Sequence, residues 1–233
     1  MKQADINSQT IGEIVAFDYR TASVFKEAGI DFCCGGKKNI DETCSEKGID
    51  PAELIEKLES IESVPNTTTH NFIEWDPGFL CDYIVNTHHK YVLKSLPDLV
   101  LYTGKIASVH GERHAELAEV AELFSQINRE LLQHMKNEEE ILFPAIKEVL
   151  SSGSGKAKAT IISEISRLSG EHEFAGGAMD KINVITHKYS VPDDGCNTYH
   201  LAFKLLQQFE DDLHTHVHLE NNVLFPKALK SAN

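Results

Sequence analysis

The sequence lacks any long apolar segment. No stretch of its 233 residues approaches the roughly 18 consecutive apolar residues that a membrane-spanning helix needs. The start of the chain, MKQADINSQTIGEIV, also lacks the apolar core of a secretory signal peptide. We therefore expect a cytoplasmic protein that has no membrane partner.

Cysteine and basic residues are also scarce. The five cysteines are an odd number and two of them are adjacent, which argues against a secreted disulfide framework and for reduced thiols. The 22 Lys and Arg residues are outnumbered by 36 Asp and Glu residues, so the formal net charge is −14. Such an acidic surface disfavours nucleic acid as a partner and suits cations or basic partner surfaces.

No segment shows the strict alternation of apolar and polar residues that predicts a β-strand. Long helical segments are predicted instead, at roughly 76–104, 112–150, 156–188 and 196–230. Four helices joined by short connections predict an antiparallel four-helix bundle. Pro97, Pro144 and Pro226 are expected to kink or break these helices.

The first part of the chain differs from the bundle. Residues 1–62 are predicted to form a small helical domain, in which Asp50 and Pro51 mark the start of a helix. Residues 63–75, with Pro, Asn and three consecutive Thr, predict a linker to a bundle domain at 76–233. Only one of the twelve histidines precedes residue 85, so the two parts are expected to do different work.

One pattern occurs twice in the bundle. It reads HMKNEEEILFP at 134–144 and HVHLENNVLFP at 216–226, so His-x3-Glu-x3-Leu-Phe-Pro is repeated. Residues four apart on a helix share one face, and each copy therefore presents an imidazole and a carboxylate to one point. A single such pair is usually a surface ion pair. The repetition in one register favours a common function for both copies.

Each copy is preceded by a further histidine at nearly the same distance. His89 lies 45 residues before His134, and His172 lies 44 residues before His216. The chain therefore consists of two halves with the same order of ligands. Helical periodicity does not distinguish His89 from its neighbour His88.

These residues predict a dinuclear metal site at the centre of the bundle. Four imidazoles and the carboxylates of Glu138 and Glu220 would come from four helices, and each carboxylate has two oxygens with which to bridge two cations. A set of imidazoles and carboxylates without thiolate favours iron or manganese.

The adjacent cysteines lie in DFCCGGKK, residues 31–38. The two glycines allow a tight turn that exposes the thiols of Cys33 and Cys34, and the two lysines are expected to favour the thiolate form. Adjacent thiols could receive iron, form a reducible disulfide or transfer electrons to the metal site; alternatively, they are small buried hydrophobes. Cys81 and Cys196 are interpreted as structural.

Together these motifs resemble the iron–sulfur cluster repair di-iron proteins, the RIC or ScdA-like family. The resemblance rests on DFCCGG, HMKNEEEILFP, SGEHEFAG and HVHLENNVLFP, in that order, and covers essentially the whole chain. It implies an all-α fold, a hemerythrin-like antiparallel four-helix bundle preceded by a small helical domain. It also implies two non-haem iron ions with an oxo or hydroxo bridge.

The resemblance further implies a function and partners. Members restore iron–sulfur clusters damaged by nitric oxide or peroxide, so the expected partners are apo or damaged iron–sulfur proteins, with a possible homodimer. We expect iron donation more than enzymatic turnover. A di-iron reductase of nitric oxide or peroxide, and an oxygen-binding or oxygen-sensing hemerythrin, are the alternative functions.

The family pattern also assigns residues. Its first ligand His stands seven residues before a Leu-Pro, and Leu96-Pro97 therefore matches His89 rather than His88. The other matches, three terminal ligands and two bridges, are His134, His172, His216, Glu138 and Glu220. Two further family positions near the iron, which would orient ligands or bind outgoing metal, match Glu130 and Glu171.

Overall fold

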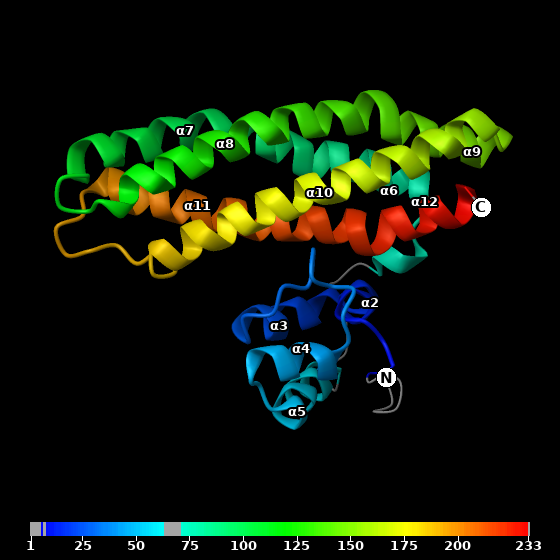
Figure 1. Cartoon of the computed structure of the whole chain (residues 1–233), viewed down its shortest axis with the longest axis horizontal. Coiled ribbons are helices and arrows are strands. Elements are labelled where there is room, and N and C mark those ends of the chain that lie inside the picture. Colours follow the sequence, from blue (N-terminus) through cyan, green and yellow to red (C-terminus); the bar gives the residue numbers. More distant parts are fainter. Residues whose placement is uncertain (1–5, 7, 63–70, 233) are drawn as a thin grey trace.

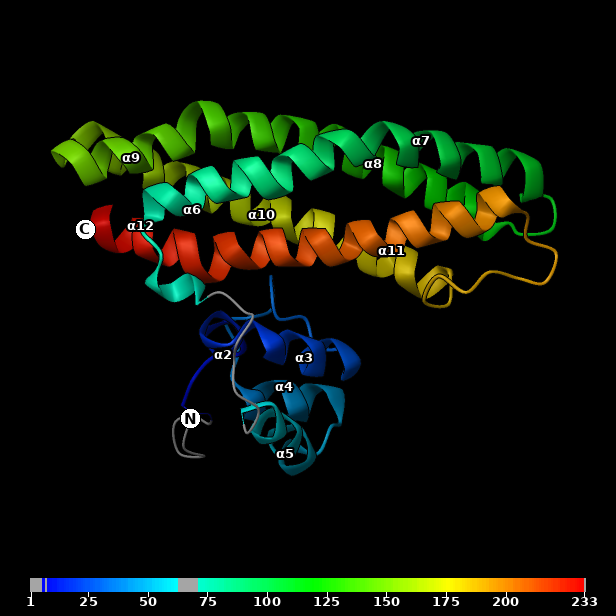
Figure 2. The same cartoon turned by 180° about the vertical axis from the view of Figure 1, so that it is seen from behind.

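The computed structural model describes residues 6, 8–62 and 71–232, and most of them are helical. Figures 1 and 2 show a long bundle of helices with a smaller group of short helices against one side. Within the described ranges, the one β-type contact is an isolated bridge between Thr10 and Asn39. This confirms the all-α fold class. In the same ranges, no helix is long and apolar enough to cross a membrane.

The bundle consists of four antiparallel rods, three of which are built from consecutive helical segments (Figure 1). In chain order the segments are α6 (Pro77–Ile84), η3 (Val85–His89), α7 (Lys90–His110), α8 (Glu116–Asn137), η4 (Glu138–Leu142), α9 (Phe143–Ser152), α10 (Gly155–Ile185), α11 (Asn197–His218), η5 (Leu219–Leu224) and α12 (Phe225–Ala232). The rods agree with the four predicted helices to within a few residues at most ends.

Three rods contain a short π-helical segment, namely η3, η4 and η5. In two of them a proline follows at once, because Pro144 and Pro226 are the second residues of α9 and α12. Proline lacks an N–H and crowds the carbonyl four residues earlier, and the wider π turn relieves this conflict. Pro97 lies inside α7, which continues past it, so the break expected there does not occur.

The small domain contains α2 (Ile11–Phe17), η1 (Tyr19–Thr21), α3 (Ala22–Glu27), α4 (Ile40–Lys47) and α5 (Pro51–Glu62). Local sequence sets several helix starts. Thr10 and Asn39 each cap a helix, and the Glu three residues later bonds back to the cap. Asp50 accepts a hydrogen bond from the backbone N–H of Ala52, as the predicted start of α5 requires.

The structure describes the last part of the predicted linker, residues 71–75. Residues 63–70 of it lie outside the described residues. Residues 71–75 pack on the bundle. They include η2 (Phe72–Glu74), and the rings of Phe72 and Trp75 form a cluster with aromatic residues of α6. The ring of Trp75 lies 4.8 Å from that of Phe72 and 5.0 Å from those of Phe79 and Tyr83. These apolar contacts hold the start of the bundle in place.

The loop between α3 and α4 carries the two adjacent cysteines and contacts the bundle at η5. The side-chain amide of Asn222 donates to the carbonyl oxygens of Phe32 and Cys33, at 3.2 and 3.1 Å. A Cβ at Gly12 would lie 2.2 Å from Oδ1 of Asn222, so this close approach requires glycine. The hydroxyl of Tyr19 lies 2.6 Å from that of Thr215. The small domain is therefore held against α11 and η5 by polar contacts.

Replacement of Asn222 by Ala should loosen this docking. It removes two hydrogen bonds to loop carbonyls, and we expect a loss of about 1–3 kcal/mol in the free energy of unfolding. Hydrogen exchange at the amides of residues 32–36 should accelerate. The matched control is Gln208→Ala, an exposed residue of α11 that should change neither quantity. Unchanged exchange in Asn222→Ala would show that the loop is held by other contacts.

Candidate metal centre

A layer of polar side chains crosses the middle of the bundle. Apolar residues pack on both sides of it: on α8 and η4, for example, Leu131 and Leu142 enclose this layer and are at most 3% exposed. The six residues of the layer are also buried, each no more than 2% exposed: His89, His134, Glu138, His172, His216 and Glu220. Six ionisable groups buried together need opposite charges among themselves or a bound cation.

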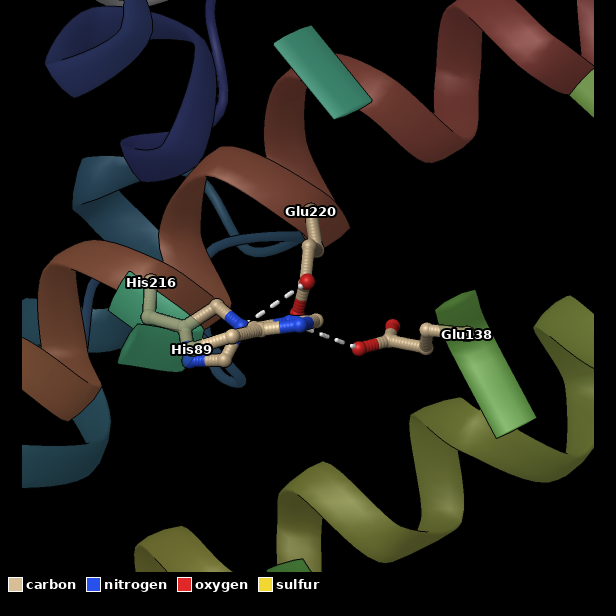
Figure 3. Close-up of side chains that lie close together, drawn as sticks. All are labelled: His89, Glu138, His216 and Glu220. Atoms are coloured by element: carbon tan, nitrogen blue, oxygen red, sulfur yellow. Dashed lines mark hydrogen bonds and ion pairs between the residues drawn. The ribbon is translucent and has the colours of Figure 1, made fainter. Parts of the chain in front are cut away.

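The six side chains form two sets that share both carboxylates. The ligand atoms in each set lie within 4.8 Å of one another. One set is His89, Glu138, His216 and Glu220, and the other is His134, Glu138, His172 and Glu220. Figure 3 shows the first set converging, with His216 and Glu220 from one rod and His89 and Glu138 from two others. The structure thus brings together all six residues that the repeated pattern singled out.

Each carboxylate faces one imidazole from each set. Oε2 of Glu138 lies 3.3 Å from Nε2 of both His89 and His134. Glu220 lies 2.9 Å from Nε2 of His216 through Oε1 and 3.1 Å from Nε2 of His172 through Oε2. The two glutamates therefore stand between the two sets, where a bridging ligand would be.

The π segments lie at this same level of the bundle. His89 ends η3, Glu138 begins η4 and Glu220 is in η5. A π turn adds a residue to the local repeat and rotates the side chains that follow, which is why such turns are frequent at functional sites.

The donor atoms fit cations better than they fit one another. Both oxygens of Glu138, Nε2 of His89 and Oε2 of Glu220 are buried, and among the described residues they have no hydrogen-bond partner. Nε2 of His134 and Nε2 of His172 face each other at 3.1 Å. Two imidazole nitrogens in this position need a shared proton or a cation. The buried donor set therefore fits a metal-binding centre.

Electrostatics keep the carboxylates ionised. Burial would raise the pKa of Glu220, but His216 and His172 hold it well below its usual range. Burial would lower the pKa of His134, but Glu138 and then Glu171 raise it to about 10. His134 and His89, whose pKa the glutamates raise, can therefore compensate the carboxylates by holding protons, whereas burial lowers the pKa of His216. Metal binding has to displace these protons, so it should weaken as the pH falls.

A further group of side chains orients the imidazoles. Nδ1 of His134 donates to Glu171 at 2.8 Å, and Nδ1 of His89 donates to Glu139 at 2.7 Å. Nδ1 of His172 lies 2.9 Å from the side-chain oxygen of Asn221. Each contact directs Nε2 towards the centre.

Glu171 was among the residues expected near the centre, whereas Glu139 and Asn221 were not. A signal for them exists, because each directly follows the glutamate of its repeated phrase and contacts the upstream histidine of its own half.

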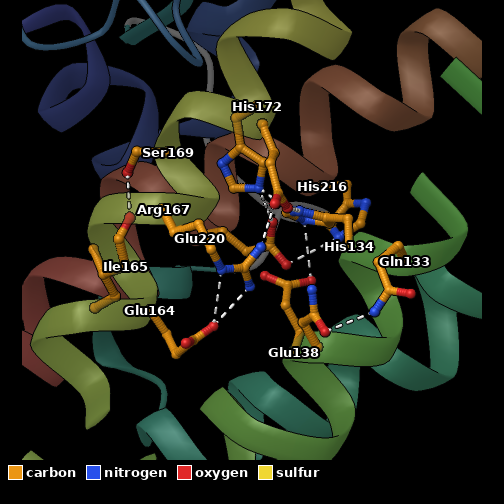
Figure 4. A network of polar contacts seen from close by, with 12 residues as sticks. Gln133, His134, Glu138, Glu164, Ile165, Arg167, Ser169, His172, His216 and Glu220 are labelled. Atoms are coloured by element: carbon orange, nitrogen blue, oxygen red, sulfur yellow. Dashed lines mark hydrogen bonds and ion pairs between the residues drawn. The ribbon is translucent and has the colours of Figure 1, made fainter. Parts of the chain in front are cut away.

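Glu171 is itself held by an arginine. Arg167, one turn earlier on α10, contacts the carboxylate of Glu171. It also donates to Glu164 at 2.7 Å (Figure 4). The hydrogen bond with His134 lowers the pKa of Glu171. The other expected orienting residue, Glu130, does not have this position. It is exposed on α8, and the described residues offer it no hydrogen bond or ion pair with the cluster.

His88 is buried but points away from the cluster, so the structure places His89 there. Nδ1 of His88 donates to Asp212 at 2.9 Å. Its ring stacks on that of His216, with centroids 5.5 Å apart. His88 therefore supports a cluster residue and does not replace His89.

The adjacent thiols are reduced and lie against the bundle, with sulfur atoms 3.9 Å apart. The expectation that Cys33 favours the thiolate form is wrong. The hydrogen bond with Cys34, burial and the negative charge of Asp31 raise the pKa of Cys33 well above its usual value. The positive charge of Lys38, which was expected to favour the thiolate, instead pairs with Glu46 at 2.5 Å.

Cys196 differs from the structural role first assigned to it. It is exposed and occupies the position just before α11, and its sulfur lies 3.2 Å from Nε2 of His110. The hydrogen bond with His110 and backbone N–H groups of α11 lower the pKa of Cys196 to about 7. Cys81 is buried, and burial raises its pKa to about 12.

Comparisons with known proteins agree with this geometry. Residues 7–62 match the ScdA_N family, a domain of unknown function, and residues 82–228 match the hemerythrin HHE cation binding domain. The chain is 34% identical to the iron-sulfur cluster repair protein ScdA of Staphylococcus epidermidis, over 95% of this chain and 99% of the relative. The chain belongs to the iron–sulfur cluster repair family of ScdA and YtfE. It is also 33% identical to YtfE of Pectobacterium carotovorum, over 95% of this chain and 97% of that relative. It is 32% identical to YtfE of Yersinia pestis, over 97% of this chain and 99% of that relative.

Metal content tests the centre directly. Protein purified without oxygen should hold about two iron ions per chain, as two sets of ligands with shared bridges require. Glu138→Ala combined with Glu220→Ala should lose most of this iron, measured by elemental analysis. The control is Glu140→Ala with Glu148→Ala, two exposed glutamates of the same rod. Equal iron in all three proteins would mean that the repeated phrase does not bind metal.

Cys196 should be the most reactive thiol of the native protein. Its alkylation by iodoacetamide, followed by mass spectrometry, should rise between pH 6 and pH 8 with a midpoint near 7, because its lowered pKa places the thiolate above that pH. His110→Gln should move the midpoint up towards the value of an ordinary thiol, roughly 8.5. The same midpoint in both proteins would contradict the role given to His110.

Proposed function

We propose that this protein repairs iron–sulfur clusters damaged by nitrosative or oxidative stress by donating iron from a labile non-haem di-iron centre. The observation that supports this proposal best is the buried pair of ligand sets that share two carboxylates. Membership of a family whose relatives are called iron-sulfur cluster repair proteins supports the purpose. The recipients would be apo or damaged iron–sulfur proteins of the cytoplasm. The homodimer stays a prediction.

The ligand sets assign a holder to each metal. His89 and His216 would hold one iron, and His134 and His172 the other. Glu138 and Glu220 would contact both. When bound, the pair of ions supplies transferable iron and open coordination positions. Four protein donors leave a six-coordinate metal incomplete, which favours exchange over permanent retention.

The residues around the centre can take up charge as iron leaves. His134 faces Glu138 and donates to Glu171, so it can be protonated in place of holding a cation. Arg167 keeps the carboxylate of Glu171 in position for this exchange. Protons would thus replace metal while the buried carboxylates stay compensated.

Three consecutive residues connect the centre with the thiol loop. Glu220 faces the imidazoles, Asn221 contacts His172, and Asn222 donates to the backbone of Phe32 and Cys33. A cavity of about 280 Å³ lies between the thiol loop and α10, and both thiols and Glu173, the residue after His172, line it. In the proposed function, Cys33 and Cys34 receive outgoing iron here.

Repair of a damaged cluster tests the function. A dehydratase whose [4Fe–4S] cluster has lost iron to peroxide should regain activity when mixed with the iron-loaded protein, in proportion to the iron supplied. The metal-free protein should restore none. Consumption of nitric oxide or peroxide over many turnovers with a supplied reductant, without transfer of iron to the dehydratase, would instead support the reductase alternative.

The paired thiols have a separable role. Cys33→Ala combined with Cys34→Ala should leave iron content unchanged but abolish repair of the dehydratase, because the centre is intact and the receiving thiols are lost. Cys44→Ala, which removes a buried cysteine of α4, is the matched control and should repair normally. Normal repair by the double variant would remove the thiol pair from the mechanism.

A further inference from the structure

A second group of metal-ligating side chains lies outside the six residues of the centre. It consists of Asp180 on α10 and of Glu210 and His214 on α11, and their ligand atoms all lie within 4.8 Å of one another. Glu210 and His214 are four residues apart and share one face of α11. Asp180 comes from the neighbouring helix. Two carboxylates and an imidazole thus converge from two rigid elements.

The carboxylate of Glu210 is an unusual group to bury. The residue is 2% exposed, and both oxygens accept from the side-chain amide of Asn183, at 3.1 and 3.0 Å. An amide carries no charge with which to compensate a carboxylate. Burial raises the pKa of Glu210 by more than the charges of His214 and Lys26 lower it, and burial also raises that of Asp180. A cation beside both groups would offset this cost.

The same three residues line the space between the two domains. A cavity of about 620 Å³ is lined by all three together with Lys26, Asn183 and residues 30–33 of the thiol loop. Asp180 and His214 also line the smaller cavity that contains both thiols.

The thiol loop provides a second ligand group in the same space. Asp31, Cys33 and Cys34 have ligand atoms within 4.8 Å of one another. The ring of Phe32 packs edge-on against His214, with centroids 6.0 Å apart, and fixes the imidazole at this boundary. Two groups of metal ligands, one hard and one with soft thiols, therefore face a shared interdomain space.

We propose that Asp180, Glu210 and His214 bind a third divalent metal ion, at a site that passes iron between solvent and the thiols of Cys33 and Cys34. Carboxylates and imidazole suit Fe²⁺ or Mn²⁺, and three protein ligands leave positions for water and for exchange. The ion enters and leaves as Fe²⁺ without change of oxidation state. The cargo role rests on the proposed function, whereas metal binding at these three residues does not.

Equilibrium dialysis against Fe²⁺ without oxygen tests the site in the full chain. Asp180→Asn combined with His214→Gln should bind one ion fewer per chain than the wild type and keep the two ions of the centre. Asp193→Asn with His200→Gln removes an exposed acid and an exposed imidazole near the start of α11, and should bind as many ions as the wild type.

The outcomes separate the two proposals. Equal binding by the wild type and by Asp180→Asn with His214→Gln would overturn the third site and leave the di-iron centre untouched. Full binding by Glu138→Ala with Glu220→Ala would instead overturn the centre.

If the Asp180 and His214 double variant unfolds, His214→Gln alone decides the matter by titration with Mn²⁺. This variant should bind the third ion at least tenfold more weakly than the wild type while its melting temperature stays the same. Unchanged affinity would overturn the site.

Discussion

The structure depends on the burial of two carboxylates at the centre of a helical bundle. Glu138 and Glu220 are both fully buried, and each would be costly there without positive charge beside it. Four imidazoles from four rods surround the carboxylates, and the positive charge would come from protonated imidazoles such as His134 or from a bound cation. Because each carboxylate must meet histidines from both sets, the relative height of all four rods is fixed at this layer. The apolar packing on either side follows from that register.

The backbone adapts to this requirement with π turns. A regular α-helix would carry proline into conflict with the carbonyl four residues before it. In the two phrases that end in Leu-Phe-Pro, η4 and η5 relieve this conflict. The segment η4 begins at Glu138, and η5 begins one residue before Glu220. The same segment, η5, then directs Asn221 to the centre and Asn222 to the thiol loop. A local response to proline thus also connects the two domains.

The sequence predicted the features that come from spacing. Helical repeats specify which residues share a face, and the duplicated phrase singled out the side chains that the structure brings together. Helix ends and caps were also predictable, because Asp50 and similar residues act on their immediate neighbours. The choice of His89 over His88 came from the family pattern, since both are buried and periodicity does not separate them.

Properties set by distant residues were not predictable in this way. The pKa of Cys33 depends on a thiol and a carboxylate that the loop folds around it, and not on the lysines beside it in sequence. The low pKa of Cys196 requires His110, which lies 86 residues earlier and meets it at the end of the bundle. Glu130 has the family position but an exposed side chain. Sequence spacing determines a face of a helix, while packing determines what that face meets.

The symmetry of the two halves ends at the ligands. His134 rests on Glu171, whose side chain is 26% exposed and is held by Arg167, also partly exposed. His216 has an Nδ1 without a partner among the described residues, and its ring stacks on the buried His88. The polar group beside His134 is therefore partly exposed, while the imidazole of His216 is enclosed. Matching histidines of the two halves thus lie in different electrostatic surroundings.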